Sequence, residues 1–138
     1  MAFEQTLTTS FKQEVLLGVH DLDTDTIKLA LYTAEASLGA STTVYGTTNE
    51  VVGTGYTAGG VILTGATVLT SGTTAYVDFD NAVWPTASFT ARGALIYNAS
   101  KGNKAIAVLD FGSDKTSSNF TVTMPSNTAT TALIRSSV

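Results

Sequence analysis

Cysteine is absent from this 138-residue sequence, and proline, histidine and charged residues are scarce. Without cysteine, the chain forms no disulfide bonds and offers no thiolate to a metal ion. Charged residues make up 13% of the chain, whereas about a quarter is usual in globular domains. The seven Lys and Arg residues are scattered and the net charge is −4. We therefore do not expect a nucleic-acid partner, because phosphate binding needs clustered basic residues.

Long apolar runs are also missing. No stretch approaches the ~18 apolar residues of a membrane-spanning helix, so we expect no membrane partner. The first residues carry neither the basic nor the apolar region of a secretory signal, which favours synthesis and folding in a cytoplasm.

What the chain has in abundance is threonine, together with 12 glycines and 43% hydrophobic residues. β-Branched residues favour strands, and glycine favours the tight turns between them. Apolar segments of strand length recur along the chain with short polar connections. We predict a mainly β fold: a single domain over residues 1–138, built as an antiparallel β-sandwich or jelly-roll-like domain with one short N-terminal helix.

The best-defined element is a β-hairpin in which two apolar runs flank the turn-rich segment Asn98–Asn103. The runs do not alternate between apolar and polar residues, which indicates strands covered on both faces. If Leu95 pairs with Ala107, Arg92 lies opposite Asp110, and a structural ion pair is the favoured interpretation. Arg92 at a subunit contact is the alternative.

A helix is predicted over residues 10–19, after an N-terminal arm of residues 1–9. Ser10 and Gln13 have the spacing of a capping box, in which each side chain bonds an unpaired backbone amide. An apolar stripe follows at helical spacing: Phe11, Val15 and Val19. We expect this stripe to pack on the sheet.

Residues 33–60 form a long Gly/Thr-rich region without a sustained period. Irregular segments of this length are usually functional or bound to something, so we predict that this region is a contact surface. Within it, Gly53–Gly60 superficially resembles a phosphate-binding loop. No Lys-Ser/Thr pair follows, and a β pattern rather than a helix comes next, so we interpret it as a turn-rich loop.

Asp21, Asp23 and Asp25 have the spacing that opens a calcium-binding loop. Thr26 stands where such a loop needs glycine, and Tyr32 where it needs a bidentate glutamate. A solvated turn after the helix is therefore predicted, and no metal site.

Isolated side chains give no catalytic pattern. His20 has no nucleophile in a recognisable setting, and we interpret it as a helix-end residue facing the dipole. Trp84, with Tyr45 and Tyr56, could line a sugar-binding surface, although such aromatics more often belong to a core or an interface. Glycan hydrolysis needs two placed carboxylates, which the sequence does not indicate. We predict no catalytic residues, no cofactor and no enzyme activity.

Five segments form a recognisable combination: SFKQEVLLGV at 10–19, IKLALYT at 27–33 with STT at 41–43, TNEVVGTGYTAGG at 48–60, AYVDFD at 75–80 and FTARGALIYNASKGNKAIAVLDFGSDK at 89–115. The combination resembles a family of small virion proteins of tailed bacteriophages. Some members of that family look like capsid decoration, or cement, proteins. The resemblance covers nearly the whole chain and carries no catalytic residues with it.

The resemblance implies a protein that adds onto an assembled phage head. A cement protein would bind across junctions between subunits of the major capsid protein, on the outer surface of the capsid, and stabilise the shell by mass action. It would be a homo-oligomer, with a trimer as the natural match to a threefold site. The alternative is a tail, baseplate or host-surface-binding component of the particle.

The arm and the Gly/Thr-rich region are the segments expected to make these contacts. The predicted interface residues are Phe3, Leu7, Tyr45, Val51, Val52 and Tyr56.

Overall fold

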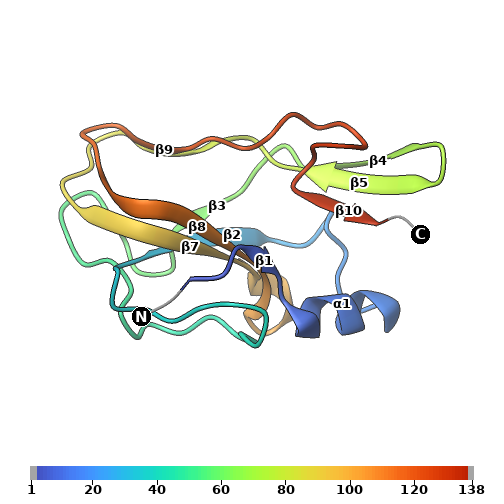
Figure 1. Cartoon of the computed structure of the whole chain (residues 1–138), viewed down its shortest axis with the longest axis horizontal. Coiled ribbons are helices and arrows are strands. Elements are labelled where there is room, and N and C mark those ends of the chain that lie inside the picture. The colour runs from blue at the N-terminus through green and yellow to red at the C-terminus, as the bar shows by residue number, and fades with distance from the viewer. Residues whose placement is uncertain (1–2, 137–138) are drawn as a thin grey trace.

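The computed structural model describes residues 3–136 (Figure 1). Within this range the order of elements is β1 (Thr6–Leu7), α1 (Thr9–Leu16), β2 (Ile27–Tyr32), β3 (Val61–Ile62), β4 (Thr67–Ser71), β5 (Thr74–Asp78), β6 (Ala82–Trp84), β7 (Thr90–Asn98), the 3-10 turn η1 (Ala99–Lys101), β8 (Lys104–Thr116), β9 (Phe120–Val122) and β10 (Ile134–Ser136). The predicted mainly β fold with one N-terminal helix is confirmed.

Three antiparallel sheets make up the domain. A five-stranded sheet has the order β1-β8-β7-β2-β3, and two smaller sheets have the orders β10-β5-β4 and β6-β9. Figure 1 shows the two smaller sheets above the five-stranded sheet, with α1 and residues 33–49 of the irregular region below it. Val51 and Tyr56 of the same region belong to or pack against the larger core on the opposite face. The five-stranded sheet is therefore covered on both faces, as in a sandwich with an added irregular layer.

Strand β2 shows how the sequence places this sheet in the middle. Ile27, Leu29 and Leu31 belong to the larger core cluster, whereas the alternate residues Ala30 and Tyr32 belong to a second cluster. Successive side chains of a strand point to opposite faces, so a strand apolar at both sets of positions is stable only between two covering layers. The larger cluster also contains Phe79, Trp84 and Phe120 from the smaller sheets and their connections.

The predicted hairpin is the pair β7–β8, but its register differs from the prediction. Leu95 pairs with Val108 rather than with Ala107, and the ladder is irregular between Ala91 and Gly93. The irregularity is a bulge that leaves Arg92 without a partner directly opposite, and Asp110 pairs with Gly93. The predicted direct opposition of Arg92 and Asp110 in the ladder is therefore wrong by one residue.

The hairpin connection has the local chemistry that its sequence predicts. The Asn98 side chain accepts a hydrogen bond from the Ser100 amide and so begins η1. Gly102 and Asn103 follow with φ values of +67° and +60°. Glycine and asparagine are the residues that tolerate this left-handed conformation best, so they allow the chain to reverse here.

The helix begins and ends earlier than predicted. Thr8, not Ser10, is the N-cap: its backbone is extended and its hydroxyl oxygen accepts the Phe11 amide. The helix ends at Leu16, because Gly18 takes a φ of +75° and the Val19 amide bonds the Glu14 carbonyl, which is a Schellman motif.

The predicted apolar stripe packs on the sheet only in part. Phe11 is buried in the larger core, but Val15 is exposed, and Val19 lies beyond the end of the helix. The prediction assumed two and a half turns of helix along the sheet. The actual helix is short and only its first turn reaches the core.

The N-terminal arm is part of the fold over its described residues. Thr6 and Leu7 pair with Val108 and Ala107 of β8, which places β1 at the edge of the five-stranded sheet. Phe3 forms a parallel bridge with Leu38 of the long irregular region. Of the predicted arm, Met1 and Ala2 lie outside the described residues.

Trp84 lies at the end of a short strand. Residues Ala82–Trp84 form β6, which pairs with β9 so that Trp84 faces Phe120. Pro85 follows directly, where a missing amide no longer interrupts the ladder. Among residues 3–136 no helix is both long enough and apolar enough to cross a lipid bilayer.

Candidate functional site

Glu50 is the centre of the long irregular region, residues 33–60. Its carboxylate is buried and accepts three hydrogen bonds, from the hydroxyls of Tyr45 (2.7 Å) and Tyr56 (2.5 Å) and from the Gly59 amide (2.7 Å). A buried carboxylate is stable when donors surround it in this way. The carboxylate therefore joins three parts of the irregular region to one another, and the Tyr56 hydroxyl also accepts the Leu31 amide of β2.

Two further tyrosines extend this Glu50 cluster to the sheet. The Tyr97 hydroxyl of β7 donates to the Gly59 carbonyl at 2.6 Å, and the Tyr32 hydroxyl of β2 donates to the Gly46 carbonyl at 2.7 Å. Tyr45 stacks on Tyr97 with ring centroids 4.5 Å apart. These contacts fix the irregular layer against the lower face of the sheet.

The ionisation of these tyrosines is suppressed. Burial, with Glu50 as a further cause, raises the pKa of Tyr97 to about 12. Burial and the bonds to Glu50 also raise the pKa values of Tyr45 and Tyr56. At neutral pH the hydroxyls remain protonated donors, so the cluster acts as a structural clamp.

The glycines of Gly53–Gly60 serve close backbone packing. A Cβ on Gly60 would lie 1.8 Å from the Leu29 carbonyl oxygen, and one on Gly55 would lie 2.3 Å from the Thr86 carbonyl oxygen. Both glycines also have positive φ, +80° and +91°. The interpretation of this segment as a turn-rich loop is confirmed. Gly60 lets the loop lie directly on β2, and Gly55 lets it lie against the connection between β6 and β7.

A second polar cluster joins α1, the acidic turn and the β7–β8 connection. Lys101 Nζ donates to both carboxylate oxygens of Asp25 at 2.8 Å, and Asn98 Nδ2 donates to Asp25 Oδ2 at 2.8 Å. Burial acts to raise the pKa of Asp25, but the bonds from Lys101, Asn98 and the Asp21 amide outweigh it and lower that pKa to about 2. The predicted fully solvated acidic turn is wrong for Asp25.

His20 belongs to the same cluster, with its side chain 0% exposed. Asn98 Oδ1 accepts the Ser100 amide, so Nδ2 of Asn98 must be the atom that donates to His20 Nδ1, at 3.0 Å. His20 Nδ1 is then an acceptor, and Nε2 carries the proton that it donates to Glu14 Oε1 at 3.0 Å. His20 connects α1 to the hairpin, which replaces the predicted contact with the helix dipole.

Arg92 and Asp110 form the predicted ion pair across the bulge. The Arg92 guanidinium also lies over the Phe3 ring, 5.5 Å from its centroid. The Gly112 amide and then Arg92 lower the pKa of Asp110. The bulge brings the two side chains together although they do not face each other in the ladder.

The six predicted interface residues differ in exposure. Val51 is buried, whereas Val52 is 95% exposed. The other four are partly buried and pack against the two core clusters or within the clamp: Phe3, Leu7, Tyr45 and Tyr56. An interface role for these residues stays a prediction, and Val52 is the member of the set most open to a partner.

The sequence prediction missed the most exposed apolar residues of the helix. Leu16 and Leu17 are 88% and 70% exposed. The sequence prediction did not distinguish these two residues from those expected to be buried, because their exposure depends on where the helix ends. The positive φ of Gly18 marks that end, and a glycine after a run of helical residues was the signal available in the sequence.

The aromatic residue considered for sugar binding is part of the core. Trp84 is buried, and its ring packs edge-on against Phe89 and Phe120 at centroid distances of 6.3 Å and 6.0 Å. The Tyr56 ring lies on the other side of Trp84 at 6.2 Å. The favoured interpretation of Trp84 as a core residue is confirmed.

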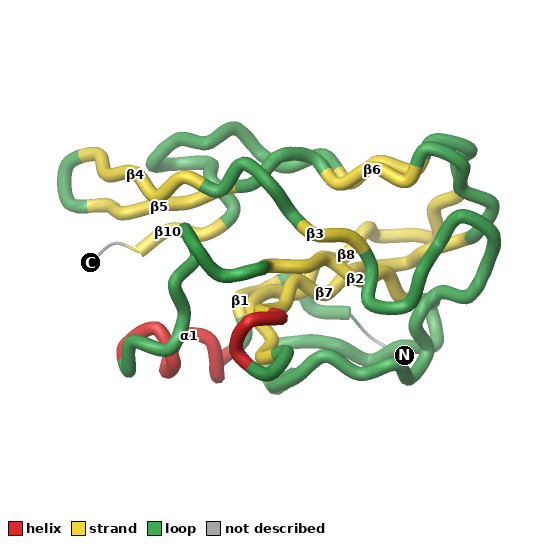
Figure 2. Tube along the Cα trace, turned by 180° about the vertical axis from the view of Figure 1, so that it is seen from behind, coloured by secondary structure: helices red, strands yellow, loops and turns green. Residues whose placement is uncertain are grey.

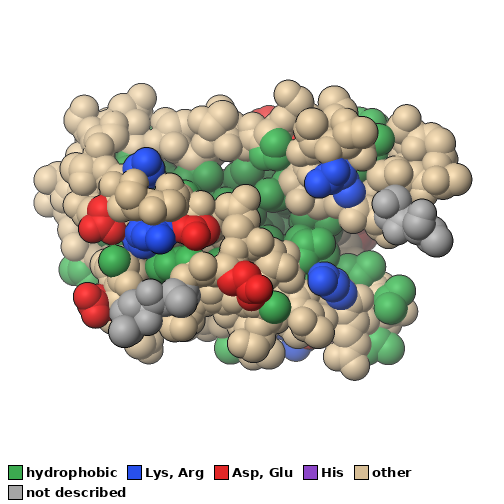
Figure 3. Space-filling view, in the orientation of Figure 1, with side chains coloured by type: hydrophobic (Ala, Val, Ile, Leu, Met, Phe, Trp, Pro, Cys, Tyr) green, Lys and Arg blue, Asp and Glu red, His purple; other side chains and the backbone are tan. Residues whose placement is uncertain are grey.

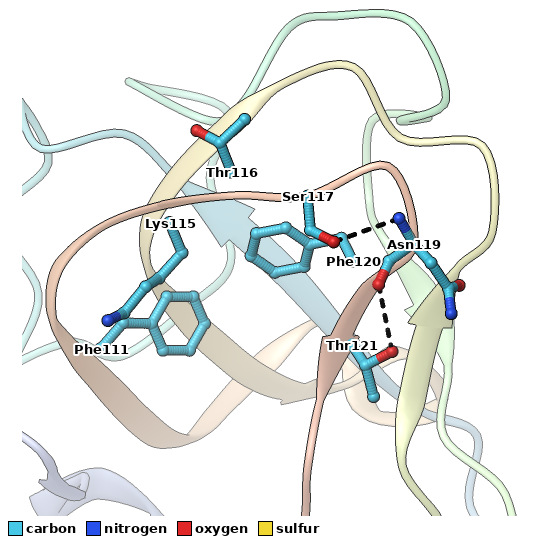
Figure 4. A pocket seen from close by; sticks show the side chains of 7 residues that line it. All are labelled: Phe111, Lys115, Thr116, Ser117, Asn119, Phe120 and Thr121. Carbon is cyan, nitrogen blue, oxygen red and sulfur yellow. Dashed lines mark hydrogen bonds between the residues drawn. The ribbon is translucent and has the colours of Figure 1, made fainter.

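Two shallow hollows occur on the described surface. The larger, of about 370 Å³, lies between the end of β8 and β9 and is lined by Phe111, Lys115, Thr116, Ser117, Asn119, Phe120 and Thr121 (Figure 4). Its polar groups bond within their own loop: Ser117 Oγ accepts the Asn119 amide, and Thr121 Oγ1 donates to the Asn119 carbonyl. The second hollow, of about 360 Å³, lies between Phe3–Glu4 and Ser37–Ser41.

Charge is mixed on the surface near these hollows. Figure 3 shows basic and acidic side chains interspersed on this face, with apolar side chains in a central hollow. Among residues 3–136, no group of three or more His, Asp and Glu side chains is placed to hold a metal ion. Over the same residues, every buried side-chain nitrogen and oxygen has a hydrogen-bond partner.

Comparison of the chain with protein-family models, with curated proteins and with solved structures found no match.

Proposed function

We propose that this chain is a structural protein of a phage virion that decorates the capsid, binding across junctions between capsid subunits. The sequence resemblance over nearly the whole chain supports the class of protein. The observation in the structure that carries a contact role is the exposure of Leu16, Leu17 and Val52 at 88%, 70% and 95%. Apolar side chains this exposed gain free energy when a partner covers them, ~1.5–3 kcal/mol for each one fully buried.

The buried polar side chains bond one another and the backbone, which supports the same proposal. Glu50, Asp25 and His20 each bond several partners within the fold. A decoration protein needs a rigid body and contact area, and it stabilises the shell by binding the assembled state. No reactive group is required for that role.

The structure changes which segments we assign to the capsid contact. The described part of the arm pairs with β8, and Ala36, Leu38 and Tyr45 of the irregular region belong to or pack against the second core cluster on the sheet. We therefore move the assignment from these segments to the end of α1, with Leu16 and Leu17, and retain Val52 from the original set.

The number of copies in purified virions tests the proposal. A decoration protein is expected in hundreds of copies per particle, measured by quantitative mass spectrometry, with matching density on the head in a particle reconstruction. A few copies located on the tail or baseplate would overturn the proposal and favour the alternative of a tail or host-binding component.

The contact assignment has its own test. The double variant Leu16→Glu/Leu17→Glu is expected to lose at least about tenfold in affinity for expanded heads, because two charges replace apolar contacts. Val83→Glu is the matched control, since Val83 is also exposed but lies in β6. Native affinity in the double variant would show that the end of α1 does not contact the capsid.

A further inference from the structure

We propose that β4 pairs antiparallel with β4 of a second copy of this chain, which joins the three-stranded sheets of two molecules into one continuous sheet. β4 lies at the edge of the sheet β10-β5-β4, and all its residues, Thr67–Ser71, are exposed. The proposal goes beyond capsid binding, because it concerns association of the chain with itself in solution.

The hairpin geometry identifies which backbone groups of β4 are free to pair. Gly72 and Thr73 form a two-residue turn between the paired residues Ser71 and Thr74. A turn of this kind closes on a hydrogen-bonded pair, and such pairs alternate with non-hydrogen-bonded pairs along an antiparallel ladder. The amides and carbonyls of Val68 and Thr70 therefore point away from β5. No other segment among residues 3–136 supplies a backbone partner for them.

One register between two copies uses all of these groups. If Leu69 lies opposite Leu69 of the second copy, Val68 of each molecule lies opposite Thr70 of the other. Each of these two pairs exchanges two N–H···O=C bonds, so four bonds form across the twofold axis. Leu69 then occupies a non-hydrogen-bonded pair, in which the two side chains come closest and contact each other.

The charge pattern also fits a second copy. No Lys, Arg, Asp or Glu occurs between Gly65 and Val77. Pairing of β4 with itself therefore sets no like charges against each other, which would oppose association. A twofold, isologous contact needs this self-complementarity, because the same patch serves on both sides.

The long free edge of β8 shows how this chain protects a strand that is not meant to pair. Beyond Leu109, the Gln5 side chain accepts the Asp110 amide, and Gly112 has a φ of +83° within the strand. Asp114 and Lys115 add charges there. Bulges, side-chain caps and charges are the usual protections of an edge strand, and β4 has none of them.

The side chains of β4 are also incompletely covered. Val68 pairs with Val77 and so shares its face of the sheet, but Val77 is a core residue whereas Val68 is 50% exposed. Figures 1 and 2 show that the β4–β5 hairpin extends to one end of the molecule, away from the five-stranded sheet. A second copy can therefore approach the edge and cover this face.

The association state of the full-length chain tests the proposal. Sedimentation equilibrium at concentrations up to about 1 mM is expected to show a monomer–dimer equilibrium, since one strand pair is a small interface. Thr70→Pro removes an amide that points away from β5, so the hairpin ladder stays intact, while the intermolecular ladder loses the two of its four bonds that the Thr70 amides donate. We expect dimerisation to weaken by at least about tenfold. Thr70→Ala is the matched control, because it keeps the amide and should dimerise like the native chain.

A cross-link tests the register. The native chain has no cysteine, so Leu69→Cys introduces a single thiol opposite its own copy, at a distance suited to a disulfide. Oxidation is expected to give a covalent dimer, whereas Val83→Cys should give little. Should the cysteine variant fold poorly, NMR of the native chain provides a second measure: the amide resonances of Val68 and Thr70 should shift with concentration more than that of Leu69.

Three results would overturn the proposal. These are a native chain that is monomeric at about 1 mM, a trimer as the main assembly, and unchanged association in Thr70→Pro. A trimer contradicts the proposal because an isologous strand pair closes at two copies. Each result is obtained without capsids, so these experiments test self-association independently of whether the chain decorates a capsid.

Discussion

The five-stranded sheet and the sheet β10-β5-β4 differ in how completely their strands are covered. In the first sheet, Leu31 of β2 and Ile96 of β7 are fully buried, and the irregular region covers the opposite face. In the second sheet, every residue of β4 is exposed. Both sheets are antiparallel, but the strands of the five-stranded sheet are rich in Leu, Ile and Ala, whereas β4 consists mainly of Thr and Ser.

The difference shows which sheet contributes more to the stability of the fold. Polar groups of β7 bind the covering segments to the five-stranded sheet: Asn98 bonds His20 and Asp25, and the Tyr97 hydroxyl donates to the Gly59 carbonyl. Regions with many buried contacts open only with global unfolding, whereas poorly covered edges open locally. The five-stranded sheet is therefore the scaffold, and the outer sheet and the end of α1 are the surfaces that we propose for association.

Truncation of a buried side chain in each sheet is the strongest test of this comparison. Leu31→Ala is expected to lower the free energy of unfolding by roughly 2–5 kcal/mol, because it removes core contacts and leaves a cavity. Val68→Ala in β4 should cost less than about 0.5 kcal/mol, since half of that side chain is already in solvent. Urea denaturation of dilute protein measures both. Similar losses for the two variants would contradict the assignment of the scaffold.

The Glu50 cluster gives the next largest effect. Glu50→Gln replaces one acceptor oxygen with an amide donor, while the donors of Tyr45, Tyr56 and Gly59 remain around it. We expect a loss of about 1–3 kcal/mol from donors left without an acceptor. Glu35→Gln is the control, because Glu35 is exposed, and it should change the free energy of unfolding by less than about 0.5 kcal/mol. An equal effect of both substitutions would mean that the carboxylate does not clamp the irregular region.

The low pKa of Asp25 predicts that the folded chain loses stability in acid. Its pKa in the folded chain is about 2, below the ordinary 3.8, so its contribution is present above about pH 4 and is lost as the pH falls through about 2. The contribution is roughly 1–2 kcal/mol, reduced from the full shift by screening, because Lys101 is 37% exposed.

The measurement is the urea midpoint of the native chain and of Asp25→Asn from neutral to acid pH. The difference between them should be largest at neutral pH and shrink below about pH 4. Asp114→Asn, at an exposed position, should follow the native curve. A constant difference at every pH would indicate that the Asp25 charge contributes nothing to the fold.

Local patterns predicted the scaffold well. The two apolar runs of the β7–β8 hairpin and its Asn98–Asn103 turn are visible in sequence, because strand burial and left-handed turn residues depend on near neighbours. The register was wrong by one residue because the ladder shifts between Ile96 and Tyr97, and a second irregularity leaves Arg92 unpaired. Such bulges depend on packing across strands. Phe3 and Asp110, which contact Arg92, are far away in the sequence.

Features that depend on tertiary structure could not be predicted. Glu50 shows no signal of burial in sequence, because its partners Tyr45 and Gly59 are near in the chain but reach it only through the irregular path of the folded loop. The strand at Trp84 has no local signal either, because its partner, Phe120, lies 36 residues further on. Leu16 is exposed because no other described segment covers it, and a local sequence pattern cannot show this.

Because Leu16 is exposed, its substitution is expected to have the smallest effect on stability. Leu16→Gln keeps a good helix former in α1 and removes an apolar side chain that is 88% exposed, so the free energy of unfolding should change by less than about 0.5 kcal/mol. Phe11→Ala in the same helix should cost roughly 3–5 kcal/mol, because Phe11 is buried in the core. Thermal and urea unfolding of both variants measure the contrast. If Leu16→Gln cost more than about 1 kcal/mol, Leu16 would be packing within the chain, and the end of α1 could not be the surface that it offers to a partner.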